Sequence, residues 1–486
     1  MSDTDVCIVG AGPTGLLLAG DLATAGLRVT LLERRSEDST LTRAFVVHAR
    51  TLEQLDARGL ADALLARGRR ADRFRVFGQV AVDLSSLPGR YPFMLVTPQY
   101  EVERALLDRA VRAGATVVRG AEVTGLQQDA DGVEVTCADG SRVRAAYAVG
   151  TDGHHSAVRR ALGLPFPGRA AARSLMLADV RMTDPPADQL TVNGKEHGFC
   201  FVVPFGDGWY RVIARDRRRE LPDDAPVTLD EIAAVARHVF GTDFGMHDPR
   251  WMSRFHSDER QAPHYRVARV FLAGDAAHVH SPAGGMGMNT GLQDAANLSW
   301  RLAAAVRGVA DPDALLDGYE RERHPVGRLV LRMSGGLLRA AMLRSAPARA
   351  LRDALVPRLL AVPPIGRRMR MLQSGIGIAY PRPRGAHRLV GTRAPDVVGT
   401  RTGTGGTRLY EALRAGRFVL VAPAGFAGPV TLAAPVTPML VRPDGYIAWA
   451  GETPEGLDAA LAAHGAVLDG LLDAGSTVCS TAHPAA

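Results

Sequence analysis

Short apolar runs that end at a glycine or an acid recur along this chain and predict an α/β fold. Residues 6–9 and 28–32 predict buried strands, and the apolar spacing of residues 16–25 predicts a helix between them. Another apolar run, residues 270–273, stops at a glycine and an acid, and helical apolar spacing resumes over residues 289–306. The pattern predicts strands and helices that alternate around a buried sheet.

A glycine-rich turn joins the first predicted strand to its helix. Gly10, Gly12 and Gly15 are spaced so that the backbone can turn tightly, approach a pyrophosphate and pack the helix against the strand. Glu33 ends the second predicted strand, where an acid can bind ribose hydroxyls. A glycine motif alone would be read as a turn, but strand, helix, second strand and acid together indicate a dinucleotide-binding βαβ unit.

The middle of the chain predicts further strands. Runs at residues 117–123 and 133–136, followed by a strand at 145–149 and separated by Asp-Gly turns, predict a small β-meander inserted in the dinucleotide-binding unit. Residues 174–257 contain several strand-like runs and predict a separate sheet layer.

Two later segments differ in composition from the rest. Residues 333–370 are basic, interrupted by prolines and apolar at helical spacing, so they predict either a membrane-surface helix or, the better interpretation, an interdomain connector. From residue 380 the composition shifts towards Pro, Gly and Thr. Residues 403–406 are glycine-rich but lack the Lys-Ser/Thr of a P-loop, and we interpret them as a loop.

Size and charge narrow the class of protein. A chain of 486 residues with 46% hydrophobic content is long enough for a large core and two or three domains. The formal net charge is +7, yet Lys195 is the only lysine and the arginines are spread throughout. A genomic bias towards Ala, Gly and Arg explains this charge better than a nucleic-acid-binding surface does.

The remaining chemistry-bearing residues exclude several other classes. The four cysteines are far apart and form no C-x-x-C pair, so we expect reduced thiols and no dithiol exchange. His154-His155 lack further ligands, and we expect no metal. Acids precede the first apolar run, which breaks at Gly10, so neither a signal peptide nor a transmembrane span fits. We expect a cytoplasmic monomer or homodimer without stable membrane insertion.

Three further motifs make the pattern specific: TRAFVVHARTLE at residues 42–53, GTDGHHSAVR at 150–159 and GDAAHVHSPAGGMGMNTG at 274–291. With the first glycine motif, they resemble the class A FAD-dependent monooxygenases, in particular the aromatic polyketide hydroxylases, and rifampicin monooxygenases are similar too. The resemblance covers nearly the whole chain.

The resemblance implies an α/β architecture with three parts. A Rossmann-type FAD-binding domain like that of p-hydroxybenzoate hydroxylase would comprise residues 1–173 and 258–332, with an inserted β-sheet substrate domain at 174–257. A helical connector at 333–379 would lead to a thioredoxin-like C-terminal domain at 380–486 that lacks C-x-x-C.

The same resemblance implies a tightly bound, non-covalent FAD and assigns its contacts. Asp275 would bind ribityl or ribose hydroxyls, and the helix amides at residues 287–289 would face the flavin pyrimidine edge, where they stabilise an anionic reduced flavin. The flavin-proximal, catalytic candidates are Arg43, Pro282 and Gly285. The candidate cofactor-binding residues are Gly10, Gly12, Pro13, Thr14, Gly15, Glu33, Arg34, Arg43, Gln99, Val123, Asp152, Asp275, Pro282, Gly285, Gly287, Met288 and Asn289. A solvated loop arginine at Arg43 and a helix cap at Gln99 are the competing interpretations.

In such enzymes the second sheet walls the substrate site. The candidates for that wall are Phe74, Phe77, Phe201, Phe205, Tyr210 and Arg211. Since side chains alternate between the two faces of a strand, only half of each strand can join the wall, and core packing competes for any single aromatic residue.

The reaction implied by the resemblance is a single-component monooxygenation. NADPH or NADH reduces the flavin, dioxygen adds at flavin C4a, and the resulting hydroperoxide transfers one oxygen to an electron-rich ring. The chain has no second complete dinucleotide fingerprint, so we expect the nicotinamide cofactor to dock transiently. No protein nucleophile is required, because the cofactor supplies the chemistry.

The substrate class remains open between related alternatives. We expect hydroxylation of a bulky aromatic, polyketide-type molecule. An antibiotic-inactivating monooxygenase for a rifamycin- or tetracycline-type substrate is the first alternative, and Baeyer-Villiger-type oxygen insertion next to a ketone is another. A non-oxygenating flavoprotein reductase and a flavin- or drug-binding protein are alternatives of other classes.

Overall fold

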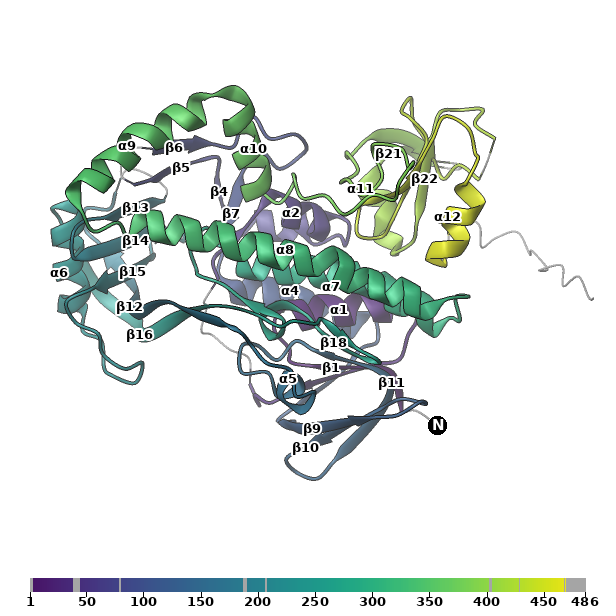
Figure 1. Ribbon diagram of the computed structural model, residues 1–486, viewed down its shortest axis with the longest axis horizontal. Helices are drawn as coiled ribbons and strands as arrows, with labels where there is room; N and C mark the ends of the chain where they lie inside the picture. The colour runs from purple at the N-terminus through teal and green to yellow at the C-terminus, as the bar shows by residue number, and fades with distance from the viewer. Residues whose placement is uncertain are drawn as a thin grey trace, which may run out of the picture.

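The computed structural model describes residues 3–37, 44–77, 80–186, 190–205, 208–401, 404–427, 429–466 and 468. Figure 1 shows an α/β body at the centre, a β-rich body on one side of it and a smaller C-terminal unit on the other. Arg43, the flavin-proximal candidate, falls outside the described residues.

The central sheet is parallel in its middle, as the βαβ pattern predicted. β1 (Thr4–Val9) runs parallel to β2 (Val29–Glu33) and β11 (Arg142–Gly150). The strand order is β17-β18-β11-β1-β2-β8, with β8 at Thr116–Arg119, β18 at Val270–Leu272 and β17 at Arg266–Val267. Because β18 is also parallel to β11, the carboxyl ends of β1, β2, β11 and β18 meet at one edge of the sheet. We call the motifs at residues 10–15, 150–159 and 274–291 the first, second and third fingerprints. All three start at this edge, where ligands of such sheets bind.

The predicted β-meander is confirmed. β9 (Val123–Gln128) and β10 (Val133–Cys137) pair antiparallel, and β10 pairs antiparallel with β11. The apolar stretch that we predicted as one run at residues 117–123 is divided, because β8 ends at Arg119 and β9 begins at Val123.

Helices stack against the central sheet. α1 (Pro13–Thr24) packs against α4 (Gln99–Arg112) and α7 (Gly287–Val306). The 30-residue α8 (Pro312–Ala341) lies across α7 (Figure 1). Every residue of α7 from Asn289 to Ala305 is buried, so this helix is a core element and not a surface helix.

The second sheet is larger than the segment 174–257 in which we predicted it. Its order is β19-β16-β12-β15-β14-β13-β5-β6, and the predicted boundaries fall inside β12 and β16. Two of its strands come from before α4 and one from the third fingerprint. The members are β5 (Arg73–Val76), β6 (Val80–Asp83), β12 (Gly168–Met182), β13 (Thr191–Gly194), β14 (Gly198–Pro204), β15 (Tyr210–Asp216), β16 (Met246–Gln261) and β19 (His278–Val279).

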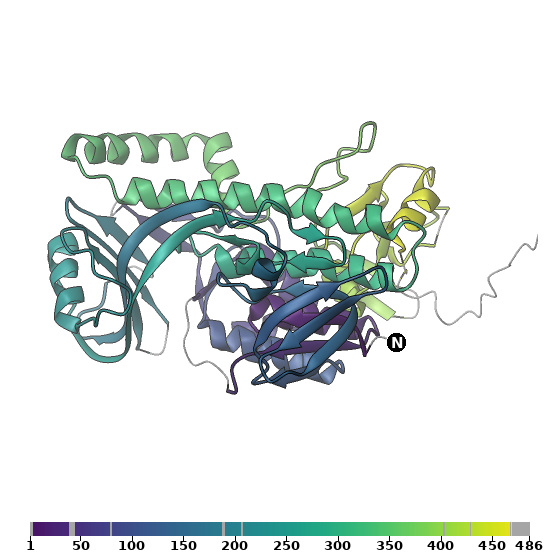
Figure 2. The ribbon, with the colours of Figure 1, turned by 60° about the horizontal axis from the view of Figure 1, so that its bottom comes forward.

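Two long strands join this sheet to the central body. β12 and β16 pair antiparallel from Gly168 opposite Arg260 to Met182 opposite Met246, and Figure 2 shows them arching between the two bodies. α6 (Leu229–Phe240) covers one face of the sheet. It begins with a capping box between Thr228 and Glu231 and ends at Gly241, which adopts a left-handed φ of 87°.

A small third sheet carries the family-like segment that follows the βαβ unit. Its order is β3-β7-β4, with β3 at Val46–Val47, β7 at Met94–Val96 and β4 at Arg69–Ala71. α2 (Ala49–Asp56) and α3 (Ala61–Leu65) follow β3, and α5 (Ala157–Ala161) follows the second fingerprint. Only His48 separates the end of β3 from the start of α2.

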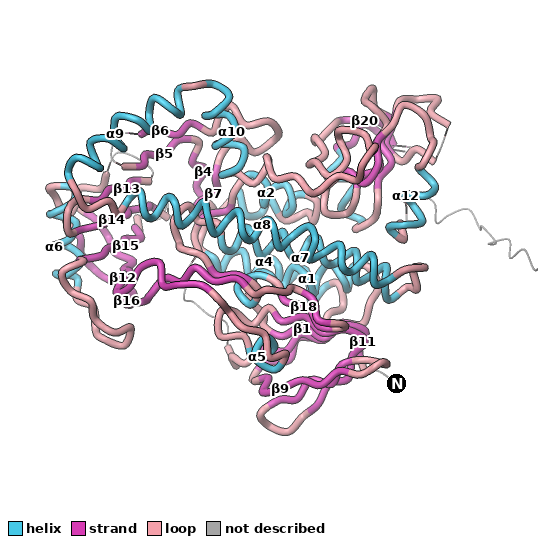
Figure 3. Tube along the Cα trace, viewed as in Figure 1, coloured by secondary structure: helices cyan, strands magenta, loops and turns pink. Residues whose placement is uncertain are grey.

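The basic segment after α8 is helical, as predicted. α9 (Ala346–Ala361) and α10 (Pro363–Gln373) follow α8, and α9 packs on β6 (Figure 3). The helical stretch starts earlier than the expected connector, because α8 already begins at Pro312.

The C-terminal unit is a six-stranded sheet with short helices. Its order is β21-β20-β23-β22-β24-β25, and the apolar runs near residues 417–421 and 439–449 form β22, β24 and β25. The thioredoxin-like character of this unit stays a prediction. The elements are β20 (Val398–Arg401), β21 (Thr404–Arg408), α11 (Leu409–Ala412), β22 (Val419–Ala422), β23 (Leu432–Ala433), β24 (Met439–Val441), β25 (Ile447–Ala450) and α12 (Leu457–His464).

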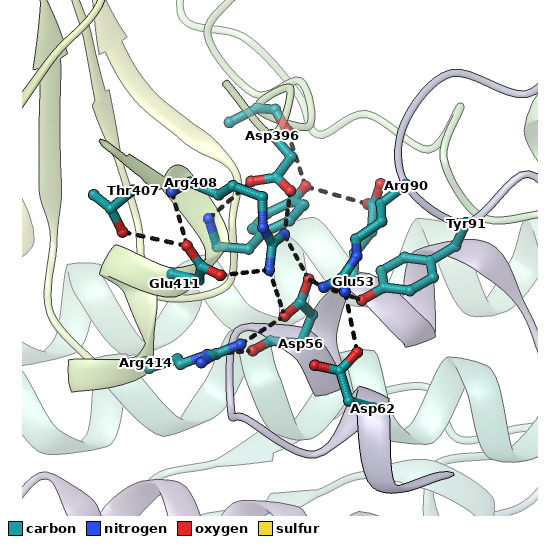
Figure 4. A network of polar contacts seen from close by, with 12 residues as sticks. Glu53, Asp56, Asp62, Arg90, Tyr91, Asp396, Thr407, Arg408, Glu411 and Arg414 are labelled. Carbon is teal, nitrogen blue, oxygen red and sulfur yellow. Dashed lines mark hydrogen bonds and ion pairs between the residues drawn. The ribbon is translucent and has the colours of Figure 1, made fainter. Parts of the chain in front are cut away.

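A buried polar network fastens this unit to α2 (Figure 4). The Asp56 carboxylate accepts hydrogen bonds from Arg408 at 2.8 Å and Arg414 at 3.1 Å, both from the C-terminal unit. Tyr91 donates to it from the central body at 2.8 Å. One turn earlier, Glu53 pairs with Arg393, so the two acids of α2 both face the C-terminal unit.

Three further structural facts bear on function. No helix in the described ranges is both long and apolar enough to cross a membrane. The described residues contain no group of three His, Cys, Asp or Glu side chains arranged to hold a metal ion. Cys7 and Cys200 are buried free thiols, and burial raises the pKa of each to about 12.

Candidate active site

The first glycine loop leaves bare backbone facing open space. A Cβ on Gly10 would lie 2.6 Å from the Thr151 carbonyl oxygen, and one on Gly15 would lie 2.1 Å from the Gly10 carbonyl oxygen. Gly12 differs, because no described atom lies within 4 Å of the place its Cβ would take. Gly12 is also the N-cap of α1, with Pro13 next to it and no capping side chain. The loop thus offers unobstructed helix amides to an anionic group such as a pyrophosphate.

Glu33 supports the same loop from β2. Its buried carboxylate accepts a 2.7 Å hydrogen bond from the Ala11 amide and bonds from the Arg35 amide and side chain at 3.0 and 2.9 Å. Burial alone would raise the pKa of Glu33, but the hydrogen bonds from Arg35 and Ala11 outweigh it and lower the pKa. The acid is therefore ionised at neutral pH beside the loop. Arg34, the neighbouring candidate, is exposed.

Asp152 organises the second fingerprint. One carboxylate oxygen accepts the amides of Ala157 and Val158 at the start of α5, at 2.6 and 3.1 Å, while the other is buried without a partner among the described residues. Burial raises the pKa of Asp152. Arg159 then donates to the Ala276 carbonyl at 2.8 Å, which connects the second fingerprint to the third.

The third fingerprint packs directly on the first. Gly274, which has a φ of 60°, begins a short 3-10 helix at Gly274–Ala276. A Cβ on Gly274 or Gly291 would lie 2.7 or 2.4 Å from the Thr14 hydroxyl, so Thr14 fills the space between them. Asp275 is exposed, and its Oδ1 lies 4.0 Å from where a Cβ on Gly287 would be. The Asp275 carboxylate therefore stands beside the N-terminus of α7.

The glycine loop before α7 is tied to the segment around β3. The Asn289 side chain donates to the carbonyls of Val46 at 2.9 Å and Gly285 at 2.7 Å, and its oxygen accepts the His48 amide at 2.8 Å. The His48 ring nitrogen Nε2 lies 2.8 Å from the Gly284 carbonyl. Burial lowers the pKa of His48, so the ring is neutral at pH 7 and donates to that carbonyl. Our sequence reasoning did not single out His48, although it lies in the family-like segment.

A buried ion cluster lies behind the third fingerprint. Asp294 on α7 accepts the Gly274 amide at 3.1 Å, and it pairs with His278 and with Arg323 of α8, each at 2.7 Å. Burial opposes ionisation of Asp294, but Arg323 and His278 lower its pKa. The sequence pointed to no role for His278 or Arg323, because the contact with α8 is 29 residues away along the chain.

The remaining cofactor candidates surround this edge in different ways. The Gln99 side chain accepts the Ala44 amide at 3.0 Å and donates to Glu103 at 2.8 Å, so it holds the start of the segment that leads to β3. Val123 is buried at the start of β9. The loop residues Pro282, Gly285, Gly287 and Met288 are all partly exposed.

Three substrate-wall candidates lie on the sheet face that meets the central body. The Phe201 ring lies 5.5 Å from that of Phe45, just before β3. The buried Arg211 guanidinium pairs with Asp179 through bonds of 2.8 and 2.9 Å and lies 5.1 Å from the centre of the Phe205 ring. Asp179 was not a sequence candidate, since the pairing of β12 with β15 that brings it to Arg211 is not visible in local periodicity.

The other three candidates lie elsewhere. Tyr210 is on the opposite face of β15 and packs in the cluster under α6, because adjacent residues of a strand face opposite sides; its place in the substrate wall stays a prediction. Phe74 and Phe77 belong to the region of β5 and β6 at the far edge of the sheet. Phe77 is buried, with the Arg352 guanidinium 4.5 Å from its ring centre.

The residues at this edge fit FAD. The open space at Gly12 admits a pyrophosphate, Glu33 is ionised beside it, and Asp275 presents a free-standing carboxylate to the solvent side. α7 begins without a capping side chain, so its first amides are directed at the same region. The glycine loop held by His48 and Asn289 completes a surface that a flat ring can cover.

Comparison with known proteins gives the same assignment. A family described as "FAD binding domain" matches residues 3–334. A rifampicin monooxygenase of Streptomyces venezuelae is 39% identical over an alignment of 469 positions that covers 93% of this chain and 97% of the relative. A 12-dehydrotetracycline 5-monooxygenase/anhydrotetracycline 6-monooxygenase of Streptomyces rimosus is 39% identical over an alignment of 491 positions, gaps included, that covers 93% of this chain and 96% of the relative.

Solved structures agree with these relatives. An anhydrotetracycline hydroxylase from Streptomyces rimosus superposes with a TM-score of 0.83 at 38% identity, over 94% of this chain and 98% of that one. The match extends through the second sheet and the C-terminal unit as well as the three fingerprints. The chain therefore belongs to the family with this FAD-binding domain and is an FAD-dependent monooxygenase.

Proposed function

We propose that this enzyme hydroxylates a bulky, electron-rich aromatic molecule of the polyketide type, with NADPH or NADH as the reductant and dioxygen as co-substrate. The observation that carries the proposal is the contact between Phe201 and Phe45. It brings the aromatic face of the second sheet next to the segment that holds the glycine loop, where a planar substrate can lie against the cofactor.

Each part of the site has a separate task in this proposal. Gly12 and the amides of α1 bind the pyrophosphate, and Glu33 and Asp275 bind hydroxyls of the cofactor. His48 and Asn289 orient the glycine loop. Phe45, Phe201 and Phe205 exclude water from the reacting ring, and bound FAD would accept the hydride of the nicotinamide cofactor and supply the activation of oxygen.

Two further assignments belong to the proposal. Arg43, which lies outside the described residues, stays the candidate for a cation that acts on the flavin, and the nicotinamide cofactor docks transiently on the FAD-binding body. We also infer a cytoplasmic enzyme that is a monomer or a homodimer. Size-exclusion chromatography with light scattering distinguishes the two oligomeric states.

The relatives support two versions of the substrate. One named relative acts on rifampicin and another on tetracycline precursors, so both biosynthetic tailoring and antibiotic inactivation fit the fold. Both relatives are 39% identical in sequence to this chain, and the residues of the proposed substrate wall do not favour one substrate over the other.

The test is a substrate screen with product analysis. Purified holoenzyme is supplied with NADPH or NADH and a panel of anthraquinones, tetracycline precursors and rifamycins, and nicotinamide oxidation and product mass are followed. We expect one class to stimulate oxidation and to gain a single oxygen atom. Substrate-stimulated oxidation that yields only hydrogen peroxide would contradict the proposal, and so would oxygen insertion that expands a ketone ring.

A further inference from the structure

A buried guanidinium without a partner lies at the far end of β15. All three side-chain nitrogens of Arg217 are buried, and none has a hydrogen-bond partner among the described residues. The Arg217 amide donates to the His197 carbonyl at 2.9 Å, so the backbone at this point is fixed. Burial of an ion without hydrogen bonds is strongly unfavourable, and such a group calls for a partner that protein atoms do not supply.

The surroundings of Arg217 are themselves basic. The pKa of Arg217 is lowered to about 10. Burial is the largest cause, and repulsion from Arg215, Arg344 and Arg349 adds to it. The Arg215 Nε is also buried without a partner in the described part of the chain. These four side chains, Arg215, Arg217, Arg344 and Arg349, form the arginine cluster.

Few acids balance the arginine cluster. Glu220 pairs with Arg215 at 2.9 Å, but its side chain is 52% exposed, and it pairs with no other arginine in the described part of the chain. Asp216, the nearest acid along the chain, pairs instead with the exposed Arg218 at 2.9 Å. The cluster therefore keeps an excess of positive charge, concentrated between the end of β15 and the start of α9.

We propose that the arginine cluster is a binding site for an oxyanion, a phosphate or a carboxylate group, which bridges the end of β15 and the start of α9. The planar guanidinium matches the two oxygens of such a group and forms paired, charge-assisted hydrogen bonds with them. A bound oxyanion satisfies Arg217 and removes the mutual repulsion of the four cations.

The position of the cluster relates it to the substrate face. Arg211 and Arg215 are four residues apart and so lie on the same side of β15, and Arg217 follows in the turn directly after the strand; six residues of chain span at most about 20 Å. The oxyanion is therefore either a free ion or the distant acidic group of a molecule whose ring lies near Phe201. This second source rests on the proposed function, whereas the first does not.

Binding of inorganic phosphate tests the site directly. Holoenzyme is unfolded by heat in sodium phosphate and in sodium chloride of equal ionic strength, and phosphate binding is measured by calorimetry. We expect phosphate to raise the midpoint of the wild type by several degrees, because a ligand that binds only the folded state stabilises it. Arg217→Met should abolish the phosphate effect, and without phosphate it should be at least as stable as the wild type, because an unpaired buried charge is gone.

The matched control is Arg218→Met, which removes an exposed arginine next to the cluster and should keep the full phosphate effect. If Arg217→Met does not yield holoenzyme, Arg344→Gln, at an exposed position, should weaken phosphate binding about tenfold. Equal midpoints of the wild type in phosphate and chloride, with no heat of binding, would overturn the proposal.

A second arm distinguishes the two sources. Pairs of aromatic substrates with and without a carboxylate or phosphate are compared in the wild type and in Arg217→Met. A KM that rises at least tenfold in the variant only for the acidic member supports an anionic substrate group, and an unchanged KM together with the phosphate effect supports a free ion. An enzyme that accepts no aromatic substrate would count against the proposed function, while the phosphate arm would still decide on the site.

Discussion

The backbone amide of His48 donates a 2.8 Å hydrogen bond to the side-chain oxygen of Asn289, 241 residues further along the chain. This bond and the two that Asn289 donates to Val46 and Gly285 fix the glycine loop against β3. One amide side chain at the third position of α7 thus sets the shape of the surface that we assign to the flavin ring.

Replacement of Asn289 should loosen this surface without unfolding the protein. Asn289→Ala removes three buried hydrogen bonds, each worth about 1 kcal/mol, so we expect FAD affinity to fall by about tenfold or more. Asn289→Asp keeps the acceptor for His48 but loses both donors, and it should bind FAD with intermediate affinity. Fluorescence titration of the apoprotein measures this, and wild-type affinity in Asn289→Ala would refute the role.

The glycines of the first loop should respond differently to the same substitution. A Cβ on Gly12 meets no described protein atom within 4 Å, so Gly12→Ala should fold normally but bind FAD at least tenfold more weakly. A Cβ on Gly15 overlaps the Gly10 carbonyl at 2.1 Å, so Gly15→Ala should lower the thermal midpoint of the apoprotein by several degrees. Calorimetry of both apoproteins and FAD titration separate the two effects. A destabilised Gly12→Ala apoprotein would show that the space is needed for packing.

Asp275 should be required for the cofactor and dispensable for the fold. Its carboxylate is exposed next to the start of α7, so Asp275→Ala should purify as a folded apoprotein with little FAD. Asp313→Ala alters another exposed acid, 81% accessible in its side chain, and should retain flavin. Absorbance at the flavin band relative to protein gives the occupancy, and a fully loaded Asp275→Ala would contradict the assignment.

The network around Asp56 should make stability sensitive to acid. Burial raises the pKa of Asp56, but hydrogen bonds from Arg408 and Tyr91 outweigh it and lower the pKa to about 2. Because the pKa of Asp56 is lower in the folded protein than its ordinary value of 3.8, the carboxylate stabilises the fold at pH values above 3.8. This contribution disappears as the pH falls from 3.8 towards 2. Urea unfolding between pH 7 and pH 2.5 should show this loss in the wild type.

Variants at the two acids that pair with Arg90 test the same network. Asp56→Asn removes the buried carboxylate that Arg408, Arg414 and Arg90 share, so it should lose about 2 kcal/mol already at neutral pH and depend less on acid. Asp62→Asn changes a 64% exposed partner of Arg90 and should behave like the wild type. Equal acid sensitivity of Asp56→Asn and the wild type would exclude Asp56 as the source.

Local patterns were sufficient for the parts of this structure that are built from neighbouring residues. The βαβ unit, the β-meander and the starts of the three fingerprints follow from runs of apolar residues and from glycines at turns. Parallel pairing of β1, β2, β11 and β18 then brings the fingerprints to one edge, which is a general property of such sheets.

Pairings between distant segments were not visible in the sequence. β5 and β6 join the second sheet because β5 pairs with β13, more than a hundred residues later, so the predicted limits of that sheet were too narrow. The same reason hid the Asp179–Arg211 pair and the bond between His48 and Asn289. Strand periodicity also left open which of Tyr210 and Arg211 faces the central body, because it gives two faces but does not say which one meets that body.

The fastening of the C-terminal unit to α2 limits how this enzyme can be recombined with its relatives. Asp56 and Glu53 pair with arginines of the C-terminal unit, so an exchanged segment without those arginines leaves only Arg90 as counter-ion for Asp56 and Arg50 for Glu53 among the described residues. A viable chimaera would have to carry α2 together with the C-terminal segment as one exchangeable block. Because α2 starts directly after His48, the crossover point falls next to the residue that holds the glycine loop before α7. An exchange of α2 therefore also touches the support of the proposed flavin surface.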